Sequence, residues 1–372
     1  MLRRLLAASV AVALLVACQV SAEAQSAVNP QSALNAISSD AAIVLRLKNP
    51  KAATEKVAGL VDAAKSGMGE QVRGQGSAIG LLISNPTLAG VDMEQDWYAA
   101  VYVPEGANKP SAGGTGEPEV VFIIPSTDLA AMKGAMDSDV TFVEHGKYGV
   151  YTGEDLAGDK TAARLKGEGA SIAGLIDKDS TALFDGGDIS IFINVKHLAQ
   201  VYADEIEQGL QQARAQLANM PGEAPAGSPG INPKQIAEIG GQLLNSLESG
   251  LKDALSCTIA ASISNEGVAF DDVVHFSPDS PATRFIARHM PSSMATLARL
   301  PSGAAGYFGV SVNMPELMNM SLEFTKAALG DGGKEFAAGL KELNGLKYGS
   351  TVTSFALGNM TEGVFRTVSV AE

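Results

Sequence analysis

The sequence is short of basic side chains. It has 27 Lys and Arg against 41 Asp and Glu, which gives a formal net charge of −14, and no run of Lys or Arg interrupts this balance. A protein that binds nucleic acid through the phosphate backbone needs a basic patch. An acidic surface also disfavours binding to anionic lipid. The composition therefore predicts that nucleic acid is not a partner.

Long hydrophobic runs are missing too, except near the N-terminus. Leu5–Ala17 is apolar apart from Ser9, and it follows Arg3 and Arg4. This stretch is shorter than the ~20 residues that cross a bilayer, but it has the length and flanks of a signal peptide. We therefore expect residues 1–24 to be an export signal and the mature chain to have no transmembrane helix.

Two processing sites compete at the end of this segment. Ala22-Glu23-Ala24 is an A-x-A site, which predicts cleavage before Gln25. Leu15-Val16-Ala17-Cys18 resembles a bacterial lipobox, which implies cleavage before Cys18 and a diacylglycerol on its sulfur. Both readings predict an exported protein of the periplasm or cell envelope. The protein is soluble in the first case and lipid-anchored at Cys18 in the second.

Cysteine is scarce, and this limits the chemistry of the chain. Cys18 and Cys257 are the two cysteines, so Cys257 has no partner for a disulfide once residues 1–24 are removed. No basic residue or histidine adjoins Cys257 to lower its pKa. We expect Cys257 to be a small buried residue on a strand.

Motifs for catalysis and metal binding are also missing. The sequence has no H-E-x-x-H, C-x-x-C or G-x-S-x-G, and its four histidines are scattered. Asp92–Asp96 begins like a calcium loop but lacks the glycine and glutamate that close one. Ser249 and Lys252 match S-x-x-K without its companion motifs. We therefore assign no catalytic residue, no cofactor-binding residue and no metal ligand.

This reasoning does not decide the role of one pair of residues, Asp271 and His275. Asp271 and His275 share a parity on a predicted strand and could lie along one face. A polar strand face that contacts water explains the same pattern.

Three alternating segments predict strands that each lead into a helix. Residues 43–47, 191–195 and 308–312 alternate with a period of two, and helical spacing follows each of them. The alternation predicts that Leu45, Ile193 and Val310 face the core of a mainly antiparallel sheet, in strands that are central in it. Asn49 and Pro50 fit the start of the first helix.

Each segment is followed by a predicted hairpin. The hairpin strands are residues 97–103 with 119–124, 257–263 with 268–276, and 350–357 with 364–370. The chain is therefore expected to be an α+β protein with mainly antiparallel sheets flanked by helices. About three loosely repeated strand–helix–hairpin units would build it.

The same pattern suggests a division into regions. We expect an N-terminal α+β unit over 38–168 and a C-terminal α+β region over 170–372. The second region would hold two repeat units, 188–280 and 296–372. Residues 220–233 are rich in Pro and Gly with few apolar side chains, which predicts a flexible loop between two helices.

The segments that enter the strands carry a resemblance to a known family. They are Thr181–Phe184, Asp188–Val195, Leu300–Phe308, and Ala89–Asp92 before the strand at Trp97. They look like the entry strands of exported proteins of unknown function that are abundant in planctomycete-type bacteria. The resemblance covers most of the mature chain, and it implies an α+β architecture with no recorded catalytic residue.

Three classes of function follow from these observations. The first is a non-catalytic binding or structural protein of the cell envelope, with an envelope protein or a ligand as its partner. The second is a hydrolase whose site is assembled from distant residues, because such sites are defined by geometry. The third is a carrier of a small ligand or lipid, which would need an apolar cavity between sheet and helices.

Overall fold

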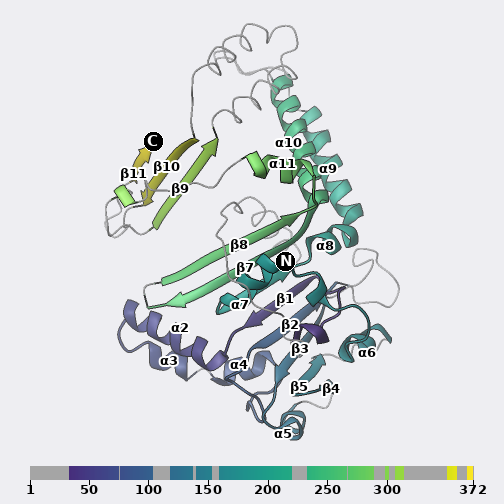
Figure 1. Cartoon of the computed structure of the whole chain (residues 1–372), viewed down its shortest axis with the longest axis vertical. Coiled ribbons are helices and arrows are strands. Elements are labelled where there is room, and N and C mark those ends of the chain that lie inside the picture. The colour runs from purple at the N-terminus through teal and green to yellow at the C-terminus, as the bar shows by residue number, and fades with distance from the viewer. Residues whose placement is uncertain are drawn as a thin grey trace. The chain divides into compact units, whose positions relative to one another are not determined.

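A computed structural model describes most of the chain (Figure 1). The described residues are 33–74, 76–103, 118–136, 140–152, 159–219, 233–265, 267–288, 298–300, 306–313, 350–357 and 367–371. The chain forms two compact units. One comprises Met1–Ala203 with Ala254–His275, and the other comprises Asp204–Asp253 with Phe276–Glu372.

The first unit contains an eight-stranded antiparallel sheet, which confirms the predicted α+β class. The strand order is β4-β5-β3-β2-β1-β6-β7-β8, as Figure 1 shows. The strands are β1 (Ile43–Leu47), β2 (Trp97–Tyr102), β3 (Glu119–Pro125), β4 (Thr141–His145), β5 (Tyr148–Thr152), β6 (Ile189–Ile193), β7 (Ala254–Ser264) and β8 (Gly267–Phe276).

Short helices flank this sheet on both faces. Alternating strand residues point to opposite faces, so each face has its own core. The helices are η1 (Ala33–Ala36), α2 (Pro50–Ala64), α3 (Gly69–Arg73), α4 (Gly76–Leu82), α5 (Leu129–Gly134), α6 (Asp159–Leu165), η2 (Ile172–Gly174), α7 (Lys178–Gly186) and α8 (Val195–Val201).

One face carries the largest core. Val44, Ala100 and Phe192 from the central strands pack there with Leu165 of α6 and Phe184 of α7. The other face carries two smaller clusters, one around Trp97, Tyr151 and Met132 of α5, the other around Leu198 of α8. The second face is therefore covered in separate patches.

The face of β1 and β6 that was expected to be inward is the less buried of the two, although Ile43 and Ile193 pack against the cluster around Leu198. Val44 and Arg46 are buried, whereas Leu45 is 36% exposed. In β6, Ser190 and Phe192 are buried and Ile189 is exposed. The reason is that the face with the polar residues is the one covered by α7, whose carbonyl groups provide partners for Arg46.

The repeat has a definite topology. β1 pairs with β2 and β2 with β3, and in the same way β6 neighbours β7 and β7 neighbours β8. The two meanders meet through their first strands, where Val44 lies opposite Phe192. The first meander has an addition, because β5 of the β4–β5 hairpin pairs with the outer edge of β3.

In both meanders, the first strand is connected to the helix that follows it in the same way. The side chain of Asn49 accepts a hydrogen bond from Ala52 N at the start of α2, with Pro50 in the first turn. The side chain of Asn194 accepts one from His197 N at the start of α8. In both cases an asparagine that follows the strand caps the helix.

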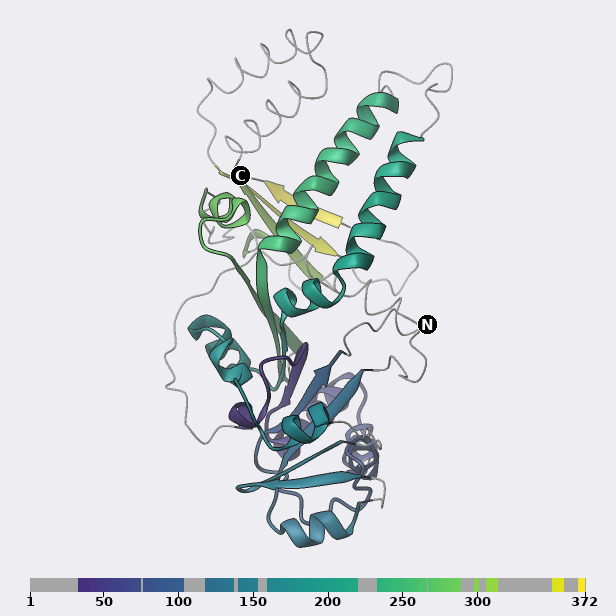
Figure 2. The same ribbon diagram turned by 90° about the vertical axis from the view of Figure 1, so that its right-hand side faces the viewer.

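The second unit has two long helices and a small sheet. Figure 2 shows α9 and α10 side by side, and Arg214 of α9 donates to Asn245 and Glu248 of α10. The sheet has the order β11-β10-β9. The elements are α9 (Ala203–Ala218), α10 (Pro233–Asp253), α11 (Pro281–Arg288), β9 (Gly306–Asn313), β10 (Ser350–Leu357) and β11 (Thr367–Ala371).

The division of the chain differs from the predicted ranges. β6 belongs to the predicted range 170–372, but it pairs with β1 of the range 38–168 in a single sheet. The strand at Val310, expected to be central, is an edge strand, since β9 pairs only with β10 among the described strands. Residues 1–24 and 220–232 lie outside the described residues.

The structure also bears on the predicted lack of a membrane span. Within the described part of the chain, no helix combines the length and the apolar character needed to cross a bilayer.

Candidate functional site

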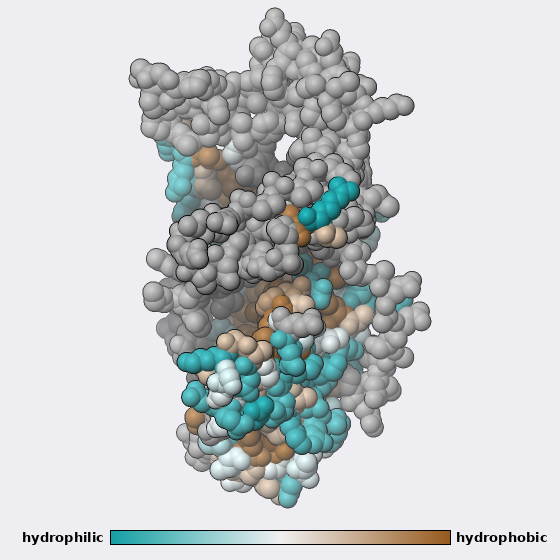
Figure 3. All heavy atoms as spheres, turned by 90° about the vertical axis from the view of Figure 1, so that its left-hand side faces the viewer, coloured by the Kyte–Doolittle hydropathy of each residue, from teal (hydrophilic) through white to brown (hydrophobic). Residues whose placement is uncertain are grey.

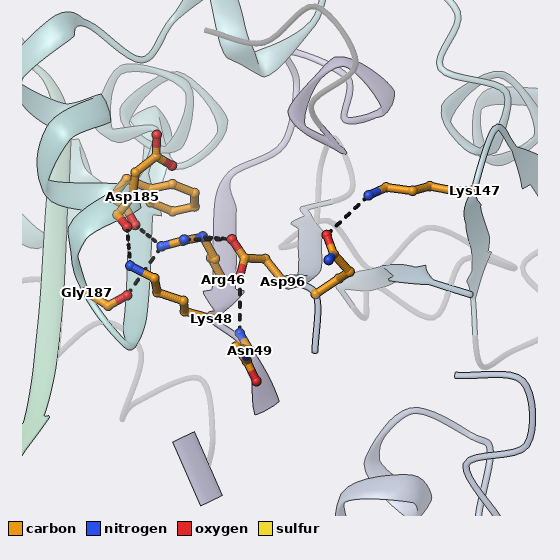
Figure 4. A network of polar contacts seen from close by, with 9 residues as sticks. Arg46, Lys48, Asn49, Asp96, Lys147, Asp185 and Gly187 are labelled. Atoms are coloured by element: carbon orange, nitrogen blue, oxygen red, sulfur yellow. Dashed lines mark hydrogen bonds and ion pairs between the residues drawn. The ribbon is translucent and has the colours of Figure 1, made fainter. Parts of the chain in front are cut away.

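Among the residues that the structure describes, the guanidinium of Arg46 has an extensive set of polar contacts (Figure 4). Its Nη1 donates to the carbonyls of Phe184 at 2.6 Å and Gly187 at 3.3 Å. Its Nε and Nη2 donate to Asp96 Oδ2 at 3.0 and 2.7 Å. Arg46 thus donates four hydrogen bonds to acceptors within the protein, and its side chain has five N–H donors.

Neighbouring groups extend this network along the ends of the strands. Asp96 Oδ1 accepts from Asn49 N, and Lys48 donates to the carbonyl of Asp185. Lys147, in the β4–β5 turn, donates to the side chain of Gln95. The network ties β1 to the segment before β2 and to the end of α7. Its geometry is that of a structural clamp, because its charged groups are already occupied by protein partners.

A second cation, which is partly buried, lies on the same face of the sheet. Arg164 of α6 forms ion pairs of 2.6 Å with both Asp40 and Glu119, and its guanidinium lies 4.2 Å from the ring centre of Tyr102. Burial raises the pKa of Asp40, but its hydrogen bonds and charge pairing with Arg164 outweigh burial, so the pKa lies below its usual value. This cluster is therefore a charged structural contact as well.

Asp188 links three elements at the start of β6. Its Oδ1 accepts from Lys56 Nζ of α2 at 2.6 Å, and its Oδ2 accepts from Ile263 N of β7 at 2.7 Å. Burial raises the pKa of Asp188, but the hydrogen bonds from these donors lower it by more. The net pKa therefore lies below its ordinary value. The carboxylate therefore stays ionised and holds the β7–β8 hairpin.

The hairpin tip is also fixed by close packing. A Cβ at Gly59 of α2 would come within 2.8 Å of Asn265 Oδ1 in the β7–β8 turn. Glycine at this position lets α2 approach the turn closely.

The near-motifs of the sequence have structural roles in the folded chain. Asp92 Oδ1 accepts from Glu94 N, and Glu94 pairs with Lys51, so the calcium-like segment is an acidic turn. Lys252 binds Glu248 rather than Ser249. These contacts leave neither segment arranged as its motif requires.

His275 also has a partner that the sequence analysis did not identify. Its Nε2 lies 2.9 Å from Asp177 Oδ2, and Asp177 caps α7 through its other oxygen. The pair therefore joins β8 to the start of α7, and Asp271 is not part of it.

The remaining site predictions can be placed briefly. Among the residues that the structure describes, no cluster of three or more His, Cys, Asp or Glu side chains could hold a metal ion. Cys18, the predicted lipidation site, lies outside them. Cys257 is buried in β7, as expected.

Among the described strands, the outer edge of β8 is one of the two edges of the sheet, and β4 forms the other. β8 has 10 residues, and β7 is its one neighbour among the described strands. Phe270 is 73% exposed and Val268 is 42% exposed, with Asp271 exposed beside them. Figure 3 shows the side of the molecule that lies on the left of Figure 1, where hydrophobic residues are exposed among hydrophilic ones.

The equivalent edge of the first meander is closed. β3, the third strand of that meander, pairs with β5 through contacts such as Ile123 opposite Val150. Val150 and Tyr151 of β5 are fully buried. The strand that occupies this position therefore contributes to the core as well as to the hydrogen-bond ladder.

Comparison with known proteins adds no assignment. No family model, no curated protein and no solved structure matches this chain.

Sequence reasoning missed the residues that define these sites. The alternation in β1 places Arg46 on a solvated face, and an apolar side chain such as Phe270 is expected to be buried. The one available signal is that Arg46 stands alone as a charge in an otherwise apolar strand, and a buried charge needs a partner. Asp96 and Asp177 carry no local signal, because their partners are distant in sequence.

Proposed function

We propose that the chain is an exported protein of the cell envelope that binds a partner without catalysing a reaction, and that the outer edge of β8 forms the binding site. The observation that carries this proposal is the exposure of Phe270 on a strand edge with no described neighbour. Natural proteins usually protect such edges by covering them, shortening them or placing lysine and proline on them.

The physical basis is the cost of leaving this edge in water. An edge strand presents N–H and C=O groups that pair readily with another strand. A large exposed aromatic side chain adds apolar area, and burial of that area contributes about 25 cal/mol per Å². Together these groups favour association with another polypeptide.

Export is tested on the protein from its own cells. Mass spectrometry of the mature chain is expected to show an N-terminus at Gln25 or a lipidated Cys18. Full-length material starting at Met1 in the envelope fraction would contradict export.

Binding is tested with a pair of variants matched in exposure. Phe270 is 73% exposed on β8 and Leu82 is 74% exposed on α4. Immobilised wild type, Phe270→Lys and Leu82→Lys are each incubated with an envelope extract. We expect at least one protein to be retained by wild type and Leu82→Lys and lost from Phe270→Lys. Equal retention by all three would contradict binding at β8.

A small-ligand or lipid carrier is the second candidate, and one observation favours it. Leu45 and Ile189 lie at adjacent central strands and are 36% and 39% exposed. A titration with a fluorescent apolar probe such as 1-anilinonaphthalene-8-sulfonate tests this candidate. Saturable binding that Leu45→Lys abolishes and Phe270→Lys leaves unchanged would favour the carrier.

A further inference from the structure

We infer that the outer edge of β8 accepts an extended segment of another protein as an antiparallel strand, and that this segment carries basic side chains opposite Asp271 and Asp272. This inference rests on the proposed function and specifies its partner. It depends on three observations: the internal repeat, the charge of β8 and its exposed apolar side chains.

The internal repeat shows what this edge can hold. β3 and β8 are the third strands of the two meanders, which meet at the β1–β6 pair. β3 carries the antiparallel strand β5 on its outer edge, whereas β8 carries none within the described residues. The β1 half of the sheet therefore extends two strands, β5 and β4, beyond β3, whereas the β6 half ends at β8 among the described strands.

The charge of β8 identifies the kind of strand. Asp271 and Asp272 lie in the middle of its 10 residues. Burial and the neighbouring carboxylate of Asp271 raise the pKa of Asp272, so negative charge is already disfavoured there. A partner strand with Lys or Arg at this level would relieve the repulsion, because opposite charges across a pair of strands stabilise a sheet.

The same charges argue against a second copy of this chain. Residues directly opposite each other in an antiparallel pair share a face, so a twofold pairing of β8 with a second copy, centred on the strand, would place Asp271 opposite Asp271 or Asp272 opposite Asp272. Two carboxylates would then face each other across the pair, and like charges directly opposite destabilise a sheet. A partner of different sequence is therefore the expected occupant.

Phe270 and Val268 define the rest of the interface. Both are exposed near the N-terminal end of β8, next to the two carboxylates. An alternating strand of apolar and small polar residues would cover them, in the way that β5 covers the edge of β3. The partner is thus an extended segment with β-branched residues around a basic centre.

The test uses two labelled peptides of ten residues. Both alternate threonine and valine, and their centres hold either two lysines or two glutamates. Fluorescence anisotropy with the full mature chain is expected to show the lysine peptide binding at least tenfold more tightly. The double variant Asp271→Lys/Asp272→Lys should reverse this preference, and Phe270→Lys should weaken both peptides. Leu82→Lys should behave as wild type.

Hydrogen exchange supplies an independent measurement. The lysine peptide should slow exchange of amides within residues 267–276 and leave those of β3 unchanged, because β5 already covers β3. Equal binding of the two peptides, or protection elsewhere in the chain, would overturn the inference.

The outcomes also separate this inference from the proposed function. If neither peptide binds while Phe270-dependent capture from the extract persists, the strand inference fails and binding at β8 stands. A dimer seen by analytical ultracentrifugation that Phe270→Lys abolishes would show a second copy at this edge and overturn the inference. Loss of Phe270 dependence in the capture experiment would contradict the proposed function itself.

Discussion

Arg46 is a charged side chain that the fold places in its interior, where it is 4% exposed. Removing a guanidinium from water costs several kcal/mol unless hydrogen bonds and an opposite charge compensate. Asp96 supplies the charge, and the carbonyls of Phe184 and Gly187 supply acceptors. The residue therefore helps to fix the position of α7 on the sheet, because two of its acceptors lie at the end of that helix.

Replacing Arg46 with methionine tests this role. The variant leaves two acceptors and a carboxylate without their donor, and we expect it to lower the free energy of unfolding by about 3 kcal/mol. Arg73→Met is the control, because Arg73 pairs with glutamates at the surface, and its loss should cost less than about 1 kcal/mol. Urea denaturation measures both. Equal losses would show that Arg46 is not a buried clamp.

Cys257 gives a second prediction at the residue scale. Burial, with a smaller contribution from Asp272, raises the pKa of its thiol to about 11. The thiolate is the reactive form, so the folded protein at pH 8 should react very slowly with a thiol reagent such as 5,5′-dithiobis(2-nitrobenzoate). In 6 M guanidinium chloride the reaction should be complete within minutes. Rapid labelling of the folded chain would contradict the buried position.

The joints between elements show how far the sequence predicts local structure. Asn49 with Pro50 predicted the start of α2, and the structure confirms it because capping depends on neighbouring residues alone. The predicted hairpin over 257–276 is confirmed for the same reason. The prediction of which face of β1 is more buried was wrong. Both alternate sets of positions in β1 carry apolar residues, and which set is buried depends on α7, which is distant in sequence.

Asp188 supplies a prediction at the scale of elements, since it connects α2, β6 and β7. Its folded pKa is depressed, so its contribution is present above the ordinary value of 3.8 and is lost as the pH falls through the folded pKa. Asp188→Asn should lower the free energy of unfolding at pH 7 by about 1–2 kcal/mol. Denaturation series should show this difference shrinking below pH 4.

A matched substitution at the surface controls for acid effects. Glu94 also pairs with a lysine, but both side chains are 66% exposed. Glu94→Gln should therefore leave the stability unchanged across the same pH range. A difference between Asp188→Asn and wild type that persists at pH 2 would mean that the charge of Asp188 is not what holds the hairpin.

At the scale of the whole molecule, the connection between α9 and α10 can be tested by proteolysis. Residues 220–233 hold four prolines and few apolar side chains, so we expect the first cuts there. The fragments should stay together in gel filtration, because Arg214 binds Glu248 across the two helices and Leu217 packs against Gly240. First cuts elsewhere, or fragments that separate, would contradict this.

The large-scale arrangement was the least predictable part of the fold. Alternation and hairpin signals predicted individual strands and the hairpin over 257–276, but the pairing of β1 with β6 joins segments that no local pattern connects. The candidate site also depends on contacts between segments that are distant in sequence. Asp271 and His275 were visible in the sequence, whereas the open edge that contains them follows from the order of eight strands.

The contact between the two first strands has a consequence for how the chain folds. Val44 of β1 lies opposite Phe192 of β6, and the nearby hydrogen bond from Arg46 to Phe184 of α7 spans 138 residues of sequence, whereas each meander closes over a shorter stretch. Closing a long loop costs entropy before its contacts form, which slows folding. The two meanders should therefore form early and dock late, so that a transient intermediate exposes two complementary, aggregation-prone strands until they find each other.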